Sequence, residues 1–237
     1  MANKNAAHDT RQQRPEEAGT IVYFVRHTDV HNPDDILYGR LPRFGLSALG
    51  RQQADVTASV LAEEPVDVFF TSPQLRARQT LKVIAAAHPD APIHTSSLLA
   101  EVVTGWQGRP HSDLEGIGFN FYDNPLHPAD EGLDDLWVRI RKFVGRVRRG
   151  YPGNNVVALT HGDIVHLARA GFRGLPIEIA SIRLPHPYPG KGSLTRFTFS
   201  GDLDATYPLS VEYYDPNGDD PAWSGGWVNM EILPADD

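Results

Sequence analysis

Three short apolar runs, each followed at once by polar side chains, constrain the fold of this chain more than any other feature. They are residues 21–25 before Arg26-His27, residues 66–70 before Thr71-Ser72-Pro73 and Arg76, and residues 156–159 before Thr160-His161-Gly162. Their length and their β-branched and aromatic content are typical of buried strands. In open α/β sheets, ligands bind beyond the carboxyl ends of the strands. The sequence therefore predicts that two histidines and two arginines meet at one sheet edge and form a pocket for a phosphoryl group.

Helix signals separate these strands. The expected helices run from Ser47 as N-cap to about Glu64, from Pro73 toward Ile84, after Glu131, and from Gly162 or Asp163 to near Gly171. The first is expected to place on its apolar side Leu49, Val56, Val60 and Leu61. The third carries the clearest amphipathic stripe, which consists of Leu133, Leu136, Trp137, Ile140, Phe143, Val144 and Val147.

Alternating strands and helices of this kind predict an α/β fold of three layers, with a mostly parallel open sheet and helices on both faces. Residues 1–19 are expected to form a disordered tail, and residues 20–214 the main domain. Within that domain, the Gly-, Pro- and aromatic-rich segment at about 105–132 is expected to be an insertion. Residues 215–237 form an acidic C-terminal extension, whose Trp223 and Trp227 are interpreted as packing anchors rather than ligand platforms.

Several motifs in a fixed order resemble those of the histidine phosphatase superfamily, which includes cofactor-dependent phosphoglycerate mutases and many small-molecule phosphatases. The most specific is the block Thr71–Thr80. The others are Val25-Arg26-His27-Thr28, Tyr38-Gly39-Arg40, Leu46-Ser47-Ala48-Leu49-Gly50, Glu101 and Leu159-Thr160-His161-Gly162-Asp163. The Arg-His-Thr sequence before a Tyr-Gly-Arg loop also resembles α-ribazole phosphatases. In this family, the insertion at 105–132 would be a cap over the pocket.

The chemistry of a phosphomonoester assigns a role to each pocket residue. The imidazole of His27 is the candidate nucleophile, which would form a phosphohistidine. Arg26 and Arg76 offer planar cations to the phosphate oxygens and should lower the pKa of His27. His161, at the start of a helix, can add a hydrogen bond at an anion site. The resemblance favours Glu101 as the proton donor, with a pKa raised by its apolar neighbours in the sequence, although the residues alone also allow an exposed strand carboxylate.

Five further residues are candidates for substrate binding. Asn32, Tyr38 and Arg40 lie where members of the resembled family often contact substrate, although Asn32-Pro33 also fits a simple turn. Gly162 begins the helix after His161, where backbone N–H groups are available to an anion. Thr28 stands where many members have glycine, so its side chain would either crowd or hydrogen-bond the phosphate.

Neither a metal nor a nucleotide cofactor is expected. His27 and His31 have i, i+4 spacing, but a strand precedes them and Asn-Pro follows, so no helix presents them together. Residues 215–226 imitate the start of a calcium loop but lack its final bidentate acid. Gly190-Lys191-Gly192 lacks the rest of a phosphate-binding P-loop.

The charge and hydropathy of the sequence restrict the classes of partner that this chain is expected to bind. The formal net charge of −8 argues against a nucleic-acid partner, since such proteins need a basic face. The apolar stretches are too short to cross a bilayer, and residues 1–19 lack the apolar core of a signal peptide, so a cytoplasmic location is expected. A small-molecule phosphomonoester is the expected partner, and homo-oligomer formation is left open.

The preferred function is a metal-independent phosphomonoesterase that acts on a small molecule through a phosphohistidine. One alternative is a phosphoglycerate mutase, but its doubly phosphorylated ligand requires basic groups in the cap. Residues 110–138 contain no Lys or Arg, whereas several acids are present, among them Asp113, Glu115, Asp123, Asp130 and Glu131. An acidic cap suits a substrate with an apolar, sugar-like or cationic body. The second alternative is a regulatory protein or a protein phosphatase of the same fold.

Overall fold

The computed structural model describes residues 19–183 and 188–233, and within them the chain forms one mixed sheet. The strands lie in the order β3-β2-β4-β1-β5-β6-β7. Their bounds are β1 Ile21–Arg26, β2 Val68–Thr71, β3 Ile93–Thr95, β4 Asn155–Thr160, β5 Leu194–Thr198, β6 Ser210–Tyr214 and β7 Val228–Met230. The strands from β3 to β1 pair in parallel, and β5, β6 and β7 continue the sheet antiparallel.

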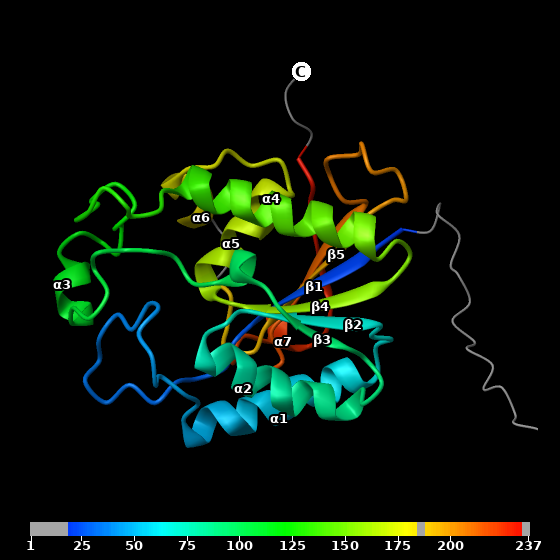
Figure 1. Cartoon of the computed structure of the whole chain (residues 1–237), viewed down its shortest axis with the longest axis horizontal. Helices are drawn as coiled ribbons and strands as arrows, with labels where there is room; N and C mark the ends of the chain where they lie inside the picture. The colour runs from blue at the N-terminus through cyan, green and yellow to red at the C-terminus, as the bar shows by residue number, and fades with distance from the viewer. Residues whose placement is uncertain (1–18, 184–187, 234–237) are drawn as a thin grey trace, which may run out of the picture.

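Helices cover both faces of this sheet, as the sequence predicts. The longer helices are α1 Ala48–Ala62, α2 Leu75–Ile84, α4 Leu133–Gly150 and α5 Gly162–Gly171, and the shorter ones are α3 His111–Glu115, α6 Ile179–Arg183 and α7 Pro221–Ser224. Figure 1 shows α1 and α2 on one face and α4 and α5 on the other. The predicted three-layer α/β architecture is therefore confirmed. No helix in the described ranges is long and apolar enough to cross a membrane.

The stripe predicted for α4 is the face that this helix packs on the sheet. Its buried side chains are Leu136, Ile140, Phe143, Val144 and Val147, while Leu133 and Trp137 are partly buried at the same core. Phe143 meets Phe24 of β1 edge to face, with ring centroids 5.9 Å apart. Asp134 and Asp135 lie in the first turn and Arg148 and Arg149 in the last, as the helix dipole favours.

Two predictions for the layer formed by α1 and α2 are wrong: the buried face of α1 and the first residue of α2. Ser47 caps α1 as expected, since its Oγ accepts from the Gly50 N–H at 2.9 Å. However, Leu49 and Val56 are 55% and 42% exposed, so they do not belong to the buried face. That face follows the small residues of the helix and Leu61: a Cβ at Gly50 would collide with the backbone of Asp29, and Oγ1 of Thr57 donates to the Gly192 carbonyl oxygen at 2.9 Å. The helix α2 begins at Leu75, two residues after Pro73.

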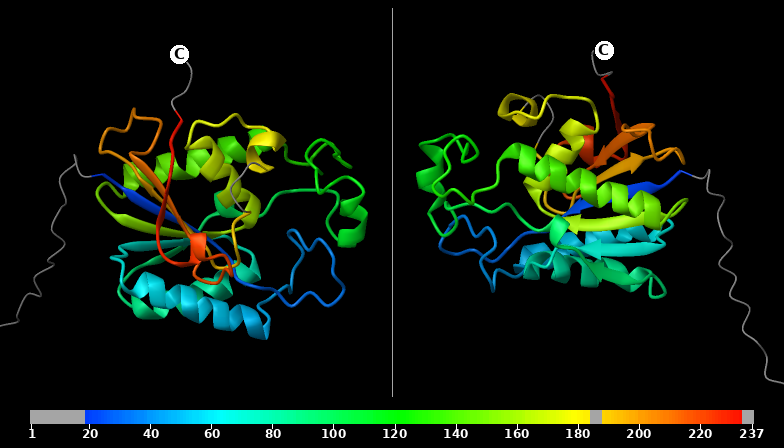
Figure 2. Two further views of the ribbon diagram at one scale, coloured as in Figure 1. Left: turned by 180° about the vertical axis from the view of Figure 1, so that it is seen from behind. Right: turned by 45° about the horizontal axis from the view of Figure 1, so that its top comes forward.

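Two connections extend beyond the carboxyl ends of β1, β2 and β4, and their position defines where a ligand can bind. One is the segment from His27 to Ser47, and the other contains α3 and runs from Glu101 to α4 (Figures 1 and 2). The second contains the segment expected to be the cap.

The C-terminal segment continues the sheet. Part of the expected extension pairs as β7 with β6, and Trp227 packs at 6.0 Å against Tyr23 of β1. The expected N-terminal tail, apart from Gly19, lies outside the described residues.

Candidate active site

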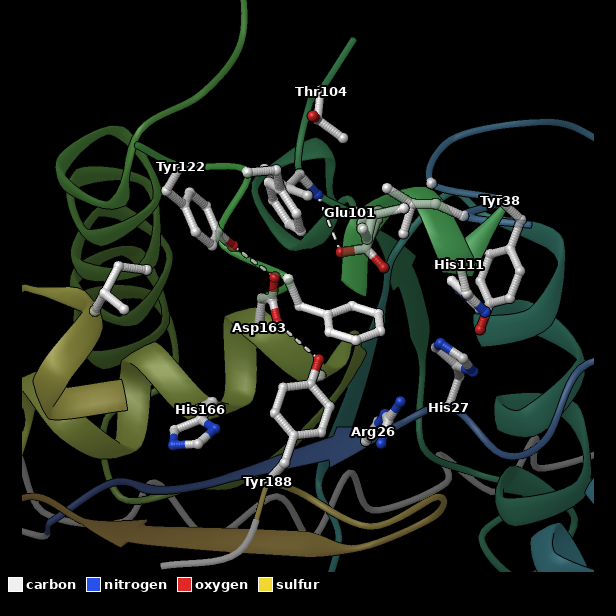
Figure 3. Close-up of a pocket in the computed structure, with 18 of the residues that line it drawn as sticks. Arg26, His27, Tyr38, Glu101, Thr104, His111, Tyr122, Asp163, His166 and Tyr188 are labelled. Atoms are coloured by element: carbon white, nitrogen blue, oxygen red, sulfur yellow. Dashed lines mark hydrogen bonds between the residues drawn. The ribbon is translucent and has the colours of Figure 1, made fainter. Parts of the chain in front are cut away.

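A cavity of about 540 Å³ lies between the strand ends and the cap segment. Its floor includes Arg26 and His27 at the end of β1, and Gly162 and Asp163 at the start of α5. Its roof includes α3 and the loop that follows it. Figure 3 shows His27, Arg26 and Glu101 turned into this space.

The ring of His27 is held in one tautomer. Its Nδ1 lies 2.8 Å from the carbonyl oxygen of Thr28. A carbonyl oxygen can only accept, so Nδ1 carries the proton and Nε2 keeps a lone pair. Nε2 accepts from Nε of Arg76 at 3.1 Å. Burial, followed by the charges of Arg76, Lys191 and Arg26, lowers the pKa of His27 well below its usual value. The side chain is therefore a neutral imidazole whose Nε2 lone pair accepts the hydrogen bond from Arg76.

Arg76 lies at the centre of the site. It is completely buried in the first turn of α2. Its Nη2 donates to His161 Nδ1 at 3.0 Å, to Glu101 Oε2 at 3.1 Å and to the carbonyl oxygen of Gly39 at 2.9 Å. Its guanidinium lies 4.6 Å from the centre of the Tyr38 ring. One cation thus joins the candidate nucleophile, acid and anion-binding histidine.

His161 is fixed from the opposite side of its ring. Its Nε2 lies 2.7 Å from Ser72 Oγ and 3.2 Å from Gln74 Oε1. Both partners can accept, so Nε2 carries the proton and Nδ1 accepts from Arg76. Burial lowers the pKa of His161 to about 4, against the opposing effect of Glu101. The lowered pKa favours a neutral ring, although Nδ1 also lies 3.2 Å from Oε2 of Glu101, and Nδ1 becomes a donor when a nearby anion favours its protonation.

The pKa of Glu101 differs in direction from the sequence-based prediction. Burial alone would raise the pKa of its carboxyl, as its apolar neighbours in the chain suggested. The interaction with His161 and the charge of Arg76 outweigh burial, and the pKa of Glu101 lies well below its usual value. The carboxylate also accepts from the Val102 N–H at 3.1 Å. Glu101 is therefore ionised and paired with Arg76.

Arg26 completes the cationic side of the cavity. Its Nη1 donates to the carbonyl oxygen of Pro189 at 2.5 Å, and its guanidinium lies 4.8 Å from the centre of the Tyr188 ring. Lys191, from the same loop, also lines the cavity, and its Nζ donates to Tyr38 Oη at 3.4 Å. Burial and the charge of Arg26 lower the pKa of Lys191 to about 7.

The structure separates the five expected substrate-binding residues into three groups. Tyr38 and Gly162 line the cavity. Arg40 lies behind it, where Nε donates to the carbonyl oxygen of Glu101 at 2.6 Å. Asn32 and Thr28 do not line it: the Asn32 amide bonds to the backbone of Ile36 in a turn.

Thr28 therefore neither crowds nor binds a phosphate from its present position. Its side chain is completely buried, and its Oγ1 lies 3.2 Å from Oγ1 of Thr80 on α2. Its backbone N–H also meets that Thr80 oxygen, at 3.2 Å. These contacts fix the turn that presents His27.

Sequence reasoning missed several residues that line the cavity or hold the histidines. They are Ser72, Gln74, His111, Tyr122, Asp163, His166, Tyr188 and Lys191. Ser72 and Asp163 were inside the matched motifs and adjacent to assigned residues, which is a usable signal. Lys191 lies between two glycines, a pattern weighed only as a P-loop. The aromatic-rich cap segment contains Tyr122, but nothing in the sequence pattern marks Tyr188.

Three side chains in the described ranges could converge on a metal ion. The ligand atoms of His27, Glu101 and His161 lie within 4.8 Å of one another. However, the guanidinium of Arg76 contacts all three, so a cation would have to displace another cation. The donor set therefore fits an anion held by Arg76 better than a metal.

Comparison with known proteins identifies the family. The model of the histidine phosphatase superfamily (branch 1) matches residues 22–205, and the chain belongs to this superfamily. It is 37% identical over 153 residues to an uncharacterized protein of Mycobacterium tuberculosis, covering 62% of this chain and 74% of that protein. It is 27% identical over 170 residues to the uncharacterized phosphatase PhoE of Bacillus subtilis, covering 70% and 83%. The adenosylcobalamin/alpha-ribazole phosphatase of Escherichia coli is 23% identical over 165 residues, covering 66% and 81%.

Solved structures share the fold. A mycobacterial glucosyl-3-phosphoglycerate phosphatase superposes with a TM-score of 0.67 at 21% identity, covering 80% of this chain and 95% of that one. YhfR of Bacillus stearothermophilus also gives 0.67, at 24% identity and with 75% and 90% covered. The family resemblance carried by the sequence motifs is confirmed, and the relatives named as phosphatases support a phosphatase.

Proposed function

We propose that this protein is a metal-independent phosphomonoesterase that hydrolyses a small-molecule phosphate through a phosphohistidine on His27. One observation carries the proposal. His27 lines the cavity, and the guanidinium that donates to its Nε2 also contacts the Glu101 carboxylate. A nucleophile, a binding site for phosphate oxygens and a proton carrier are thus within reach of one phosphoryl group.

In the first step, Nε2 of His27 attacks phosphorus. The N–P bond forms as the ester P–O bond breaks, and the leaving alkoxide takes a proton from Glu101. Glu101 is ionised, so the substrate must change its protonation. A bound phosphoryl dianion engages Arg76, withdraws it from the carboxylate and adds negative charge nearby. Both effects raise the pKa of Glu101 and allow it to carry the proton.

In the second step, water attacks the phosphohistidine. Glu101, now a carboxylate, takes a proton from that water, the N–P bond breaks and inorganic phosphate is released. The Nδ1–H of His27 stays bonded to the Thr28 carbonyl oxygen throughout, so the ring keeps its orientation. The proton on Glu101 then returns to solvent or to the departing phosphate.

Charge stabilisation comes from groups that are in place before the substrate arrives. Arg26, Arg76 and Lys191 surround the floor of the cavity with His161 and the amino end of α5. Because phosphoryl transfer depends mainly on positioning and electrostatics, these groups should supply most of the rate enhancement. The phosphoryl oxygens would also favour protonation of His161 Nδ1, which then donates to them.

The cap supports a phosphatase over a mutase. Its residues that line the cavity are His111, Leu114, Gly118, Phe119, Phe121 and Tyr122, and none is Lys or Arg. A mutase must hold a second phosphate against the phosphoenzyme, and this roof offers no cation for it. With 3-phosphoglycerate and 2,3-bisphosphoglycerate, we expect phosphate release with little 2-phosphoglycerate. Rapid isomerisation without phosphate release would instead assign a mutase.

The volume of the cavity supports a small-molecule substrate. About 540 Å³ lies within the usual range of small-molecule sites, roughly 300–1,000 Å³. A regulatory protein or a phosphatase of protein substrates is accordingly the weaker alternative. The cytoplasmic location and the oligomeric state stay predictions from the sequence.

Replacement of the nucleophile tests the proposal. His27→Ala should abolish phosphate release from p-nitrophenyl phosphate, because it removes the ring nitrogen proposed as the nucleophile, and His161, the other histidine beside Arg76, is assigned to binding the phosphoryl oxygens. His31→Ala is the matched control, since His31 is exposed and lies four residues further along the same segment. EDTA should leave the wild-type rate unchanged. Full activity in His27→Ala, or a strict metal requirement, would overturn the mechanism.

A further inference from the structure

The side of the cavity away from His27 contains a carboxylate held between two tyrosines. Oδ2 of Asp163 accepts from the Tyr122 hydroxyl and Oδ1 from the Tyr188 hydroxyl, each at 2.6 Å. Figure 3 shows this row of side chains across the cavity from His27, with His166 beside it. The three groups come from the cap, the first turn of α5 and the loop before β5, so three separate segments hold one carboxylate in place.

Asp163 has no cationic partner in a salt bridge within the described ranges. The charges that act on it from its surroundings are those of Glu101 and Arg26. Burial, with a further effect of Glu101, raises the pKa of Asp163, although the two tyrosine hydroxyls and Arg26 oppose the shift. Each carboxylate oxygen has one hydroxyl donor and keeps further lone pairs available to a ligand.

Apolar side chains make up much of the remaining lining of this region, beside Thr104, His111 and His166. Leu114, Phe119, Phe121 and Ile179 line it together with Leu37. Phe119 has a left-handed backbone with φ of 56°, an uncommon and costly conformation for a bulky residue. Its ring is 50% exposed and lines the cavity. Such strain at a ligand cavity is typical of a residue placed for binding rather than for packing.

We infer that Asp163, held by Tyr122 and Tyr188, forms the polar end of a leaving-group subsite that selects phosphate esters of apolar alcohols bearing an ammonium or hydroxyl donor and rejects those bearing a second anion. This inference rests on the proposed phosphomonoesterase function and names its substrate class. The phosphoryl group lies at the cationic floor, the apolar body contacts Phe119 and Leu114, and the donor group reaches Asp163.

The argument for rejection of anions is electrostatic. A carboxylate or second phosphate in this region would face Asp163, and the described roof supplies no Lys or Arg to neutralise it. Like charges brought together in a partly desolvated site strongly disfavour binding. An ammonium group in the same place would be attracted to the Asp163 carboxylate, and a hydroxyl group can donate to Asp163 without a change in net charge.

Three matched probes test the inference: 4-(aminomethyl)benzyl phosphate, 4-(hydroxymethyl)benzyl phosphate and 4-carboxybenzyl phosphate. They share one body and an alkoxide leaving group, so they differ mainly in the group presented to Asp163. For the wild type, we expect kcat/KM to be about tenfold or more higher for the aminomethyl than for the carboxy probe, with the hydroxymethyl probe between them. This comparison requires no variant.

The variant Asp163→Asn tests whether Asp163 causes the difference in kcat/KM between the probes. The amide keeps an acceptor for one tyrosine and removes the charge, so the aminomethyl-to-carboxy ratio of kcat/KM should fall about tenfold. Asp123→Asn is the matched control, because it removes an exposed charge from the same cap segment at a residue that does not line the cavity. Its ratio should equal that of the wild type.

The outcomes separate this inference from the function on which it rests. If the wild type hydrolyses p-nitrophenyl phosphate and the three probes equally, the subsite is wrong and the phosphatase stands. A uniform loss for all probes in Asp163→Asn would mean that the residue only supports the fold, and the same ratio change in Asp123→Asn would indicate a diffuse effect of charge. Either result overturns the inference. Failure of the wild type to hydrolyse any of the four esters overturns the proposed function and the subsite together.

Discussion

The two ends of the cavity are built on different principles. At the phosphoryl end, His27, Arg76 and His161 are completely or almost completely buried, and each follows a strand end or begins a helix. At the leaving-group end, Asp163 meets Tyr122 from the cap and Tyr188 from a distant loop, and Phe119 is half-exposed on a left-handed backbone. The first end is cationic, whereas the second is apolar with one carboxylate.

This difference separates the chemistry from the selectivity. The strand ends place the reacting groups relative to the sheet, so that end should act in the same way on any phosphate ester. The cap and the loop before β5 determine which alcohol fits. Substitutions at the phosphoryl end should therefore change the rate for all substrates or for a class of leaving group, and substitutions at the other end should change the ranking of substrates.

The largest expected effect belongs to Glu101 at the phosphoryl end. Glu101→Gln should lower kcat for benzyl phosphates by about 10²–10⁴-fold, the usual contribution of general acid catalysis. The loss should be much smaller for p-nitrophenyl phosphate, since nitrophenolate leaves without a proton. The aminomethyl-to-carboxy ratio should not change. Rates for the two ester classes can be measured under saturating conditions.

The exposed cap residue Glu115 provides the control for that substitution. Glu115→Gln removes the same charge without contact with the cavity and should retain the wild-type rate for both ester classes. Equal losses for benzyl and nitrophenyl esters in Glu101→Gln would mean that another residue donates the proton, or that Glu101 is needed equally for hydrolysis of the phosphohistidine.

Lys191 should contribute a smaller, pH-dependent effect at the same end. Its lowered pKa of about 7 means that the ammonium is charged below neutral pH and loses its charge above it. Inhibition by sulfate, which stays a dianion, should therefore weaken as the pH rises through about 7. In Lys191→Met, sulfate should bind about tenfold more weakly at low pH, the size of one hydrogen bond to a charged group. The pH dependence should be lost.

The exposed Lys142 on α4 supplies the matched variant for this measurement. Lys142→Met should keep both the wild-type affinity for sulfate and its pH dependence. The lowered pKa values of His161 and His27 favour neutral rings near neutral pH, so the pH dependence that is lost in Lys191→Met is the part that depends on Lys191. A wild-type inhibition constant that is flat across neutral pH would contradict a role for Lys191 in anion binding.

The smallest effect concerns the strain at the leaving-group end. Phe119→Gly should increase the free energy of unfolding by about 1 kcal/mol, because glycine adopts a left-handed conformation without the penalty of a side chain. The same variant should lose activity toward benzyl phosphates through a higher KM. Urea unfolding and steady-state kinetics measure the two changes.

Leu126 offers a comparison for this stability change. It is a half-exposed apolar residue of the same cap segment without a left-handed backbone, so Leu126→Gly should decrease the free energy of unfolding. A decrease for Phe119→Gly as well would show that the Phe119 ring contributes more through packing than its backbone costs. The strain argument for a binding role would then fail.

The sequence predicted the phosphoryl end well because its placement is local. An apolar run that ends in Arg26-His27 or precedes His161 fixes which sheet edge receives those side chains, whatever the rest of the chain does. The family pattern supplied Arg76. The stripe on α4 was predictable for the same reason, since its period of 3.6 residues is a property of one segment.

The leaving-group end could not be predicted in this way. Tyr122 and Tyr188 are far apart in the chain and reach Asp163 only through the tertiary fold. The prediction of a raised pKa for Glu101 was wrong for a related reason. Its neighbours in the sequence are apolar, but its neighbours in space are Arg76 and His161. Leu49 and Val56 were misplaced because close contacts of Gly50 and Thr57 with loops distant in the chain, rather than hydrophobicity alone, decide which face of α1 is buried.

The position of the transferred phosphoryl group tests the central claim most directly. Wild-type enzyme turning over p-nitrophenyl phosphate in the presence of EDTA would be quenched in base, which preserves phosphohistidine, and digested for mass spectrometry and ³¹P NMR. We expect phosphate on the peptide that contains His27, attached at Nε2, because Nδ1 is held by the Thr28 carbonyl oxygen. Phosphate on another residue or at Nδ1, or hydrolysis without any phosphoenzyme under rapid quench, would contradict the mechanism.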